Sequence, residues 1–167
     1  MSGSAAASSA SAASSSSFSV PRVVVHPTKQ LLSDAIGARL LTALVDVQAE
    51  RGHVSVVLTG GSLGSAVLAS LGALAGRDAV DWTKVDVWWG DERFLPQGDP
   101  DRNETQNRQA LLDSLPLDPT RVRAMPGPDG PDGDDVAAAA ARYAGWLAEA
   151  AGAGAGGART EAESPTF

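Results

Sequence analysis

The sequence contains no cysteine, few aromatic residues and no long apolar run. The lack of cysteine excludes disulfides, thiolate nucleophiles, iron–sulfur clusters and cysteine-bound zinc. No apolar stretch approaches the ~20 residues that a transmembrane helix needs, so we expect no membrane partner. Basic residues are also scarce, because 13 Lys and Arg stand against 20 Asp and Glu and give a net charge of −7. Without a basic patch, nucleic acid is not an expected partner either.

The two ends of the chain differ in composition from its middle. Residues 1–17 are almost entirely Ser and Ala, with too little apolar surface to offset the entropy of ordering, so we predict a disordered tail. This stretch lacks the basic start and apolar core of a secretory signal, and the cytoplasm is the expected compartment. Residues 152–167 are rich in Gly and Ala, which predicts a flexible linker ending where a further strand would start. One domain is expected over residues 18–151.

Strand-like and helix-like segments alternate within this domain. Short β-branched runs predict strands at residues 22–26, 54–58, 85–89 and 121–125. Apolar residues at helical spacing predict helices over residues 28–52, 65–75, 103–115 and 136–150, the first and third capped by Thr28 and Asn103. The alternation predicts an α/β fold with a mainly parallel sheet and helices on both faces. Ligands of such sheets bind beyond the carboxyl ends of the strands, which directs attention to the loops after residues 58 and 89.

The first of these loops is Thr59-Gly60-Gly61-Ser62. Two glycines let the main chain turn sharply and approach a ligand closely, and the next helix offers free N–H groups at its N-terminus. These features suit a phosphate. The spacing matches neither a Walker A loop, since no Lys follows, nor a Gly-x-Gly-x-x-Gly fingerprint. The alternative is a tight strand-to-helix turn in which Ser caps the helix.

The second loop, Asp91-Glu92-Arg93, directly follows the run of Val and Trp at 85–89 and Gly90. Asp91 is a candidate to accept a proton or bind a sugar hydroxyl, and the planar guanidinium of Arg93 suits a phosphate or carboxylate. Glu92 is expected either to orient Arg93 or to face water. The alternative for the whole loop is a solvated turn with a surface ion pair worth ~0–1 kcal/mol.

Other polar residues receive structural interpretations. His26 and His53 are the two histidines, and neither has a partner at metal-ligand or triad spacing. Four acids precede the last predicted helix but lack the Gly and Glu of a calcium-binding loop, so they predict a solvated loop: Asp129, Asp132, Asp134 and Asp135.

Three segments in this order and at this spacing resemble the 6-phosphogluconolactonase family. They are Thr59-Gly60-Gly61-Ser62, Trp88-Trp89-Gly90-Asp91-Glu92-Arg93-Phe94-Leu95-Pro96 and Asp99-Pro100-Asp101-Arg102-Asn103-Glu104-Thr105-Gln106-Asn107. The resemblance covers nearly all of residues 23–151 and implies a Rossmann-like α/β fold similar to that of glucosamine-6-phosphate deaminase. It also implies hydrolysis of 6-phospho-D-glucono-1,5-lactone to 6-phosphogluconate, the second step of the oxidative pentose phosphate pathway, with no metal or organic cofactor.

The resemblance also implies the roles of individual residues. Arg93 would contact the phosphate end of the substrate, Asp91 would lie in the active-site cleft and Asn103 in the same neighbourhood, and the sugar-phosphate loop would comprise Gly60, Gly61 and Ser62. The catalytic base of the family is a His in a later Gly-x-Gly-x-Asp-Gly-His motif, which does not occur in this sequence. We therefore expect the N-terminal portion of an actinobacterial-type lactonase, inactive alone.

Two other functions stay open at this point. A non-catalytic domain that binds a phosphorylated sugar would keep both loops and need no base. A glucosamine-6-phosphate deaminase-like isomerase is the second, although its relatives usually have Asp-Glu-Tyr where this chain has Asp-Glu-Arg. A sheet that lacks further strands would also leave an edge unpaired, so we expect self-association.

Overall fold

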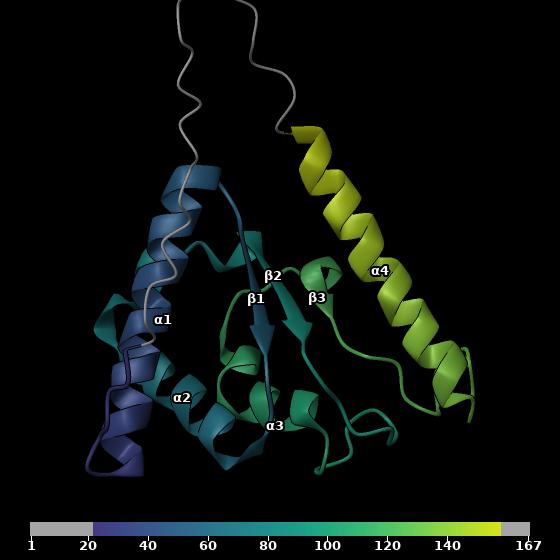
Figure 1. The fold of residues 1–167 in the computed structure, drawn as a ribbon, viewed down its shortest axis with the longest axis horizontal. Helices are drawn as coiled ribbons and strands as arrows, with labels where there is room; N and C mark the ends of the chain where they lie inside the picture. The colour runs from purple at the N-terminus through teal and green to yellow at the C-terminus, as the bar shows by residue number, and fades with distance from the viewer. Residues whose placement is uncertain (1–21, 158–167) are drawn as a thin grey trace, which may run out of the picture.

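The computed structural model describes residues 22–157, and its centre is a parallel sheet. Its strands lie in the order β1 (Val54–Leu58), β2 (Val85–Trp89) and β3 (Val122–Arg123), so that β2 is central (Figure 1). β1 pairs with β2 along its whole length, whereas β3 pairs with β2 only at Val87 and Trp88. Because the strands are parallel, the loops that follow β1 and β2 leave the sheet at the same end. The predicted parallel sheet is confirmed.

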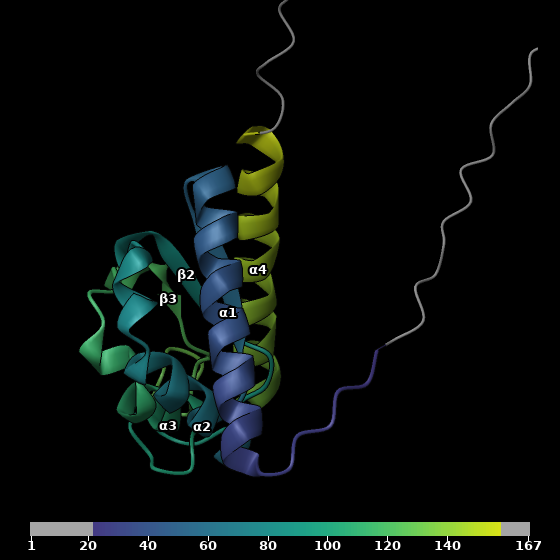
Figure 2. The ribbon, with the colours of Figure 1, turned by 90° about the vertical axis from the view of Figure 1, so that its left-hand side faces the viewer.

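Helices lie on both sides of this sheet, as predicted. The described α-helices are α1 (Lys29–Arg51), α2 (Gly61–Ala73), α3 (Asn103–Ala110) and α4 (Val136–Gly157). Short 3-10 helices occupy Ala75–Ala79, Trp82–Lys84, Leu112–Ser114 and Pro119–Arg121. Figure 1 shows α1 and α4 on opposite sides of the strands, and Figure 2, seen from the α1 side, shows α4 behind α1. Within residues 22–157, no helix is long and apolar enough to span a bilayer.

Alternate residues of β2 face opposite sides of the sheet, as the period of a strand requires. Val85, Val87 and Trp89 are buried in the main core, which they share with Leu44, Leu68, Leu71, Leu111 and Leu112. Trp88 lies on the other face, and its ring stands 5.9 Å from that of Tyr143 on α4. The sheet therefore separates a large core under α1 and α2 from a smaller contact with α4.

The ends of α1 follow the predicted capping pattern. Thr28 Oγ1 accepts a hydrogen bond from the Leu31 N–H at 3.2 Å, and Gly52 ends the helix in the left-handed region with φ of 75°. The apolar spacing misplaced other boundaries, since α2 begins at Gly61 and α4 continues to Gly157. The predicted tail and most of the predicted linker lie outside the described residues, so the domain limits stay predictions.

The strand predicted at residues 22–26 is wrong. This segment has no strand partner in the described part of the chain, and the side chains of Val23 and Val25 are 84% and 85% exposed. A β-branched composition fits a strand, but a strand forms only against the edge of a neighbour. The strand predicted at 121–125 is shortened to β3 for the same reason, because only two of its residues pair with β2.

The outer edge of β1 is also unpaired among the described residues. A groove of about 420 Å³ runs beside β1, and α1 and α2 supply much of its apolar wall through Ile36, Leu40, Leu63 and Val67. On the opposite face of the sheet from the main core, Val57 is 65% exposed.

Tyr143 joins α4 to the sheet. Its hydroxyl accepts a hydrogen bond from the Trp89 N–H and donates one to the Trp89 carbonyl, both at 2.9 Å. Because β3 ends opposite Trp88, the phenol occupies the place where a further residue of β3 would pair. Burial raises the pKa of Tyr143, so its hydroxyl stays protonated at neutral pH and can both donate and accept.

Replacing Tyr143 by Phe tests this contact. The Tyr143→Phe variant leaves two buried main-chain groups of Trp89 without partners, so its free energy of unfolding should fall by about 1–3 kcal/mol in urea titrations. Thr42→Val, which removes an exposed hydroxyl from α1, is the control and should change stability by no more than about 0.5 kcal/mol. Equal unfolding midpoints for the two variants would contradict the assigned role.

Candidate functional site

The loop between β1 and α2 uses its two glycines for different reasons. Gly60 lies directly against the side chain of Asn103, and any Cβ at this position would collide with that amide. Gly61 has φ of 77°, in the left-handed region that favours glycine. Gly60 is the N-cap of α2 and provides no capping side chain, so the alternative in which a Ser caps this helix is wrong. The first N–H groups of α2 are thus free of any capping side chain.

The loop after β2 meets the glycine loop at Asp91. Thr59 Oγ1 and Asp91 Oδ1 are 3.4 Å apart, and the Gly90 N–H donates to the Leu58 carbonyl at 2.9 Å. Asn103, at the start of α3, donates from Nδ2 to the main-chain oxygen of Asp91 at 2.9 Å. Three of the predicted site residues are therefore brought together here: Gly60, Asp91 and Asn103.

Arg93 lies at the same end of the sheet but faces another hollow. It is exposed and forms no ion pair with any acid in the described chain, so the predicted alternative of a surface ion pair is not observed. With Phe94, Met125 and Tyr143 it lines a cavity of about 230 Å³ beneath the first turns of α4. Gly60, in contrast, lines the groove beside β1. The loops meet at Asp91, whereas their outer residues border separate hollows.

Glu92 has a role that neither sequence-based interpretation predicted. Its side chain is 3% exposed, and its carboxylate accepts hydrogen bonds from the N–H groups of Arg93, Asn103 and Glu104 at 2.8, 2.7 and 2.9 Å. The last two are the first N–H groups of α3, which receives no cap from its own N-cap residue. The carboxylate therefore caps α3 from outside and stabilises the positive end of its dipole. Asn103, predicted as the cap, is the first helical residue instead.

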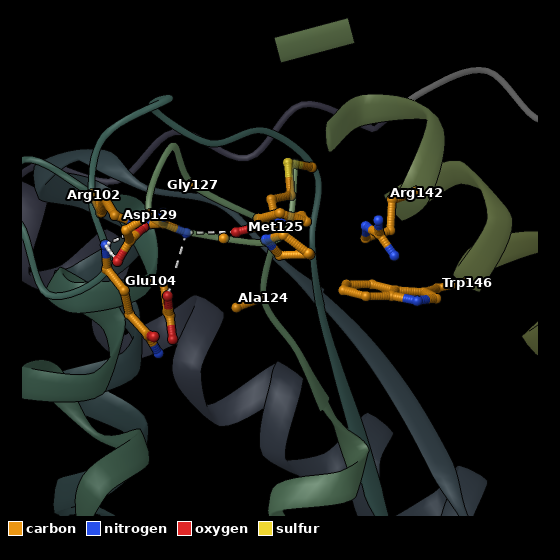
Figure 3. A pocket seen from close by; sticks show the side chains of 12 residues that line it. Arg102, Glu104, Ala124, Met125, Gly127, Asp129, Arg142 and Trp146 are labelled. Atoms are coloured by element: carbon orange, nitrogen blue, oxygen red, sulfur yellow. Dashed lines mark hydrogen bonds and ion pairs between the residues drawn. The ribbon is translucent and has the colours of Figure 1, made fainter. Parts of the chain in front are cut away.

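Arg102 neutralises this buried acid. Its side chain is 1% exposed, and its guanidinium lies 3.7 Å from Glu92 and 3.4 Å from Glu104. It also donates to the main-chain oxygens of Leu95 and Met125 at 2.8 and 2.7 Å. Figure 3 shows the guanidinium between the Glu104 carboxylate and Met125. Two loops that are distant in sequence are thereby held to the start of α3.

The acidic loop before α4 makes structural contacts. Asp132 forms a two-bond ion pair with Arg142, both bonds at 2.7 Å, and this pairing lowers the pKa of Asp132. Asp135 caps α4 by accepting two N–H groups of its first turn, and Asp129 accepts the N–H of Gln97. Across a cavity of about 260 Å³ from Arg102, α4 presents Arg142 and Trp146 (Figure 3). No cluster of three or more potential metal ligands occurs within residues 22–157.

Comparison with known proteins identifies the family. The family model described as glucosamine-6-phosphate isomerases/6-phosphogluconolactonase matches residues 27–167. The chain belongs to this family.

Among curated relatives, this member of the glucosamine-6-phosphate isomerase/6-phosphogluconolactonase family is similar to two bacterial lactonases. It is 60% identical over 130 residues to the 6-phosphogluconolactonase of Streptomyces coelicolor, which covers 78% of this chain and 50% of the relative. It is 40% identical over 107 residues to the 6-phosphogluconolactonase of Mycobacterium leprae, which covers 64% of this chain and 42% of the relative. The chain thus spans about half the length of the curated relatives it matches.

Solved structures of the family share its fold. The 6-phosphogluconolactonase of Trypanosoma brucei matches with a TM-score of 0.57 and 25% identity, covering 77% of this chain and 48% of that one. A monomeric glucosamine-6-phosphate deaminase matches with a TM-score of 0.61 and 17% identity, covering 74% and 48%, which shows the fold alone. The predicted Rossmann-like α/β fold is confirmed.

The free energy of unfolding of this family member should depend strongly on the buried charge of Glu92. In Glu92→Gln the side chain cannot balance Arg102, and its NH2 group faces main-chain donors, so the free energy of unfolding should fall by about 3–5 kcal/mol. Glu50→Gln, at an exposed position of α1, should change stability by at most about 0.5 kcal/mol. Both values can be measured by chemical denaturation. An E92Q variant as stable as E50Q would show that this carboxylate does not hold the loops together.

Proposed function

We propose that this chain forms the phosphosugar-binding part of a 6-phosphogluconolactonase, which hydrolyses 6-phospho-D-glucono-1,5-lactone to 6-phosphogluconate. The observation that carries the proposal is the meeting of the glycine loop and the Asp-Glu-Arg loop at one end of the sheet. The uncapped N–H groups at the start of α2, in the loop of Gly60, Gly61 and Ser62, suit phosphate oxygens, and Arg93 adds an exposed positive charge. Asp91 and Asn103, between these two parts, are assigned to the sugar.

The chemistry of the reaction indicates which part of it this chain serves. Lactone hydrolysis transfers an acyl group to water and needs a general base and donors for the oxyanion. Phosphate binding is remote from the reacting carbonyl, so its contribution is to hold the ring in place. His53 directly precedes β1 and therefore lies at the opposite end of the sheet, and His26 lies in the segment before α1. We accordingly assign substrate positioning, and not the base, to this chain.

Replacing Arg93 tests the proposed phosphate contact. The chain should bind 6-phosphogluconate in calorimetric titrations, and Arg93→Gln should weaken binding about 10-fold to 100-fold, since a hydrogen bond to a charged group contributes about 1.5–3 kcal/mol. Arg39→Gln, which makes the same charge change at an exposed position of α1, should bind like the parent chain. No binding by the parent, or equal losses in both variants, would contradict the proposal.

Two further assays with the parent chain distinguish the proposed function from its alternatives. With fresh lactone, we expect little acceleration over spontaneous opening, because a general base typically contributes ~10²–10⁴ in rate. A rate comparable to that of a full-length relative would contradict this expectation. Tighter binding of glucosamine 6-phosphate than of 6-phosphogluconate would favour a deaminase-like isomerase. We also propose the cytoplasm as the compartment, since sugar phosphates cross membranes only with carriers.

We further propose that copies of the chain associate through the free edge of β1. The strand carries no charge or proline that would protect an edge, and it borders an apolar groove.

Val57 provides the test of this association. In sedimentation velocity, the average mass of the parent chain should rise with concentration, and Val57→Lys should shift it toward the monomer. Val136→Lys places the same charge on an exposed valine of α4, which is 57% exposed, and should leave association unchanged. A parent chain that stays monomeric at all concentrations would contradict the proposal.

A further inference from the structure

Asn107 is a buried polar residue that the proposed function does not use. It lies on α3 one turn after Asn103, and its side chain is fully buried. Residues four positions apart share one face of a helix, so the side-chain amides of Asn103 and Asn107 lie one turn apart on the same face of α3. This face of α3 points at the end of the sheet where the two loops meet.

The amide of Asn107 holds the residue that opens the glycine loop. Its Nδ2 donates to the main-chain oxygen of Thr59 at 3.3 Å, across 48 positions of sequence. The next peptide leads into Gly60, which is extended with φ of −89° and ψ of −159°, and then into Gly61 with its positive φ. Fixing the Thr59 carbonyl therefore fixes the direction in which the first N–H groups of α2 point.

The other atom of the same amide argues against a simple packing role. Asn107 Oδ1 is buried and has no hydrogen-bond partner in the described structure. A buried polar atom without a partner is unfavourable, and an apolar side chain of similar size would fill the space without that cost. Among the described residues, the bond to Thr59 is the one contact of this side chain that only a polar group can make.

We propose that Asn107 is a positioning residue of the phosphosugar site, acting through the Thr59 carbonyl on the main chain of Gly60 and Gly61. The inference rests on the proposed function for its ligand, but the positioning itself is a property of the free protein. Asn103 completes the arrangement, because it contacts Gly60 and donates to Asp91. One face of α3 thus sets the position of both loops.

Hydrogen exchange of the free protein tests the positioning without any ligand. In Asn107→Leu, the amides of residues 64–66, which are the first in α2 that can donate within the helix, should exchange at least about tenfold faster than in the parent, while those of β2 stay protected. Ser33→Ala is the matched control, because Ser33 is equally buried and also donates to a main-chain carbonyl, that of Lys29 on α1. It should leave the exchange of residues 64–66 unchanged. Unaltered exchange of these residues in N107L would overturn the proposal.

Ligand binding supplies the second readout. N107L should bind 6-phosphogluconate about 10-fold to 100-fold more weakly than S33A, since misplaced binding groups lose affinity steeply. If the parent chain does not bind this ligand, the proposed function fails, while the exchange data still decide the positioning role. Asn107→Asp, which keeps the size but cannot donate when ionised, replaces N107L should the latter unfold. Global unfolding of both variants would assign Asn107 to stability and overturn the proposal.

Discussion

The buried carboxylate of Glu92 is the interaction on which the functional end of the molecule depends. It binds three main-chain N–H groups and lies beside the guanidinium of Arg102. Each partner would be unfavourable alone, since a helix terminus, an arginine and an acid buried without partners all lose their hydration. Together they fix where α3 starts relative to β2, and that start places Asn103 between Gly60 and Asp91.

The parallel sheet then explains why two loops that are distant in sequence lie together at one end of the sheet. β1 and β2 pair in register from Val54 opposite Val85 to Leu58 opposite Trp89, so both strands end at the same level. The loops need only short extensions beyond this level to meet. α3 joins them from one side through its amides, while α4 borders the other side and is held to β2 by Tyr143. Membership of the glucosamine-6-phosphate isomerase/6-phosphogluconolactonase family agrees with this arrangement.

The sequence predicted features whose causes are local and missed those whose partners are distant. Thr28 caps the helix that begins beside it, and β2 forms where its own Val and Trp residues predict a strand. Residues 22–26 have strand composition, but no neighbouring edge is present for them in the described chain. The partners of Glu92 on α3 lie 11 and 12 positions away, and that of Asn107 lies 48 positions away. No local pattern reports such contacts. The two loops can be predicted from the sequence because their glycines and charges directly follow strands.

We propose that the glycine loop and the Asp-Glu-Arg loop bind one anionic sugar together. A titration of 15N-labelled protein with 6-phosphogluconate, followed by amide chemical shifts, is the decisive experiment. The amides of Gly61 and Arg93 should shift along the same saturation curve, with one dissociation constant. Shifts confined to one loop, or two curves with different midpoints, would contradict it.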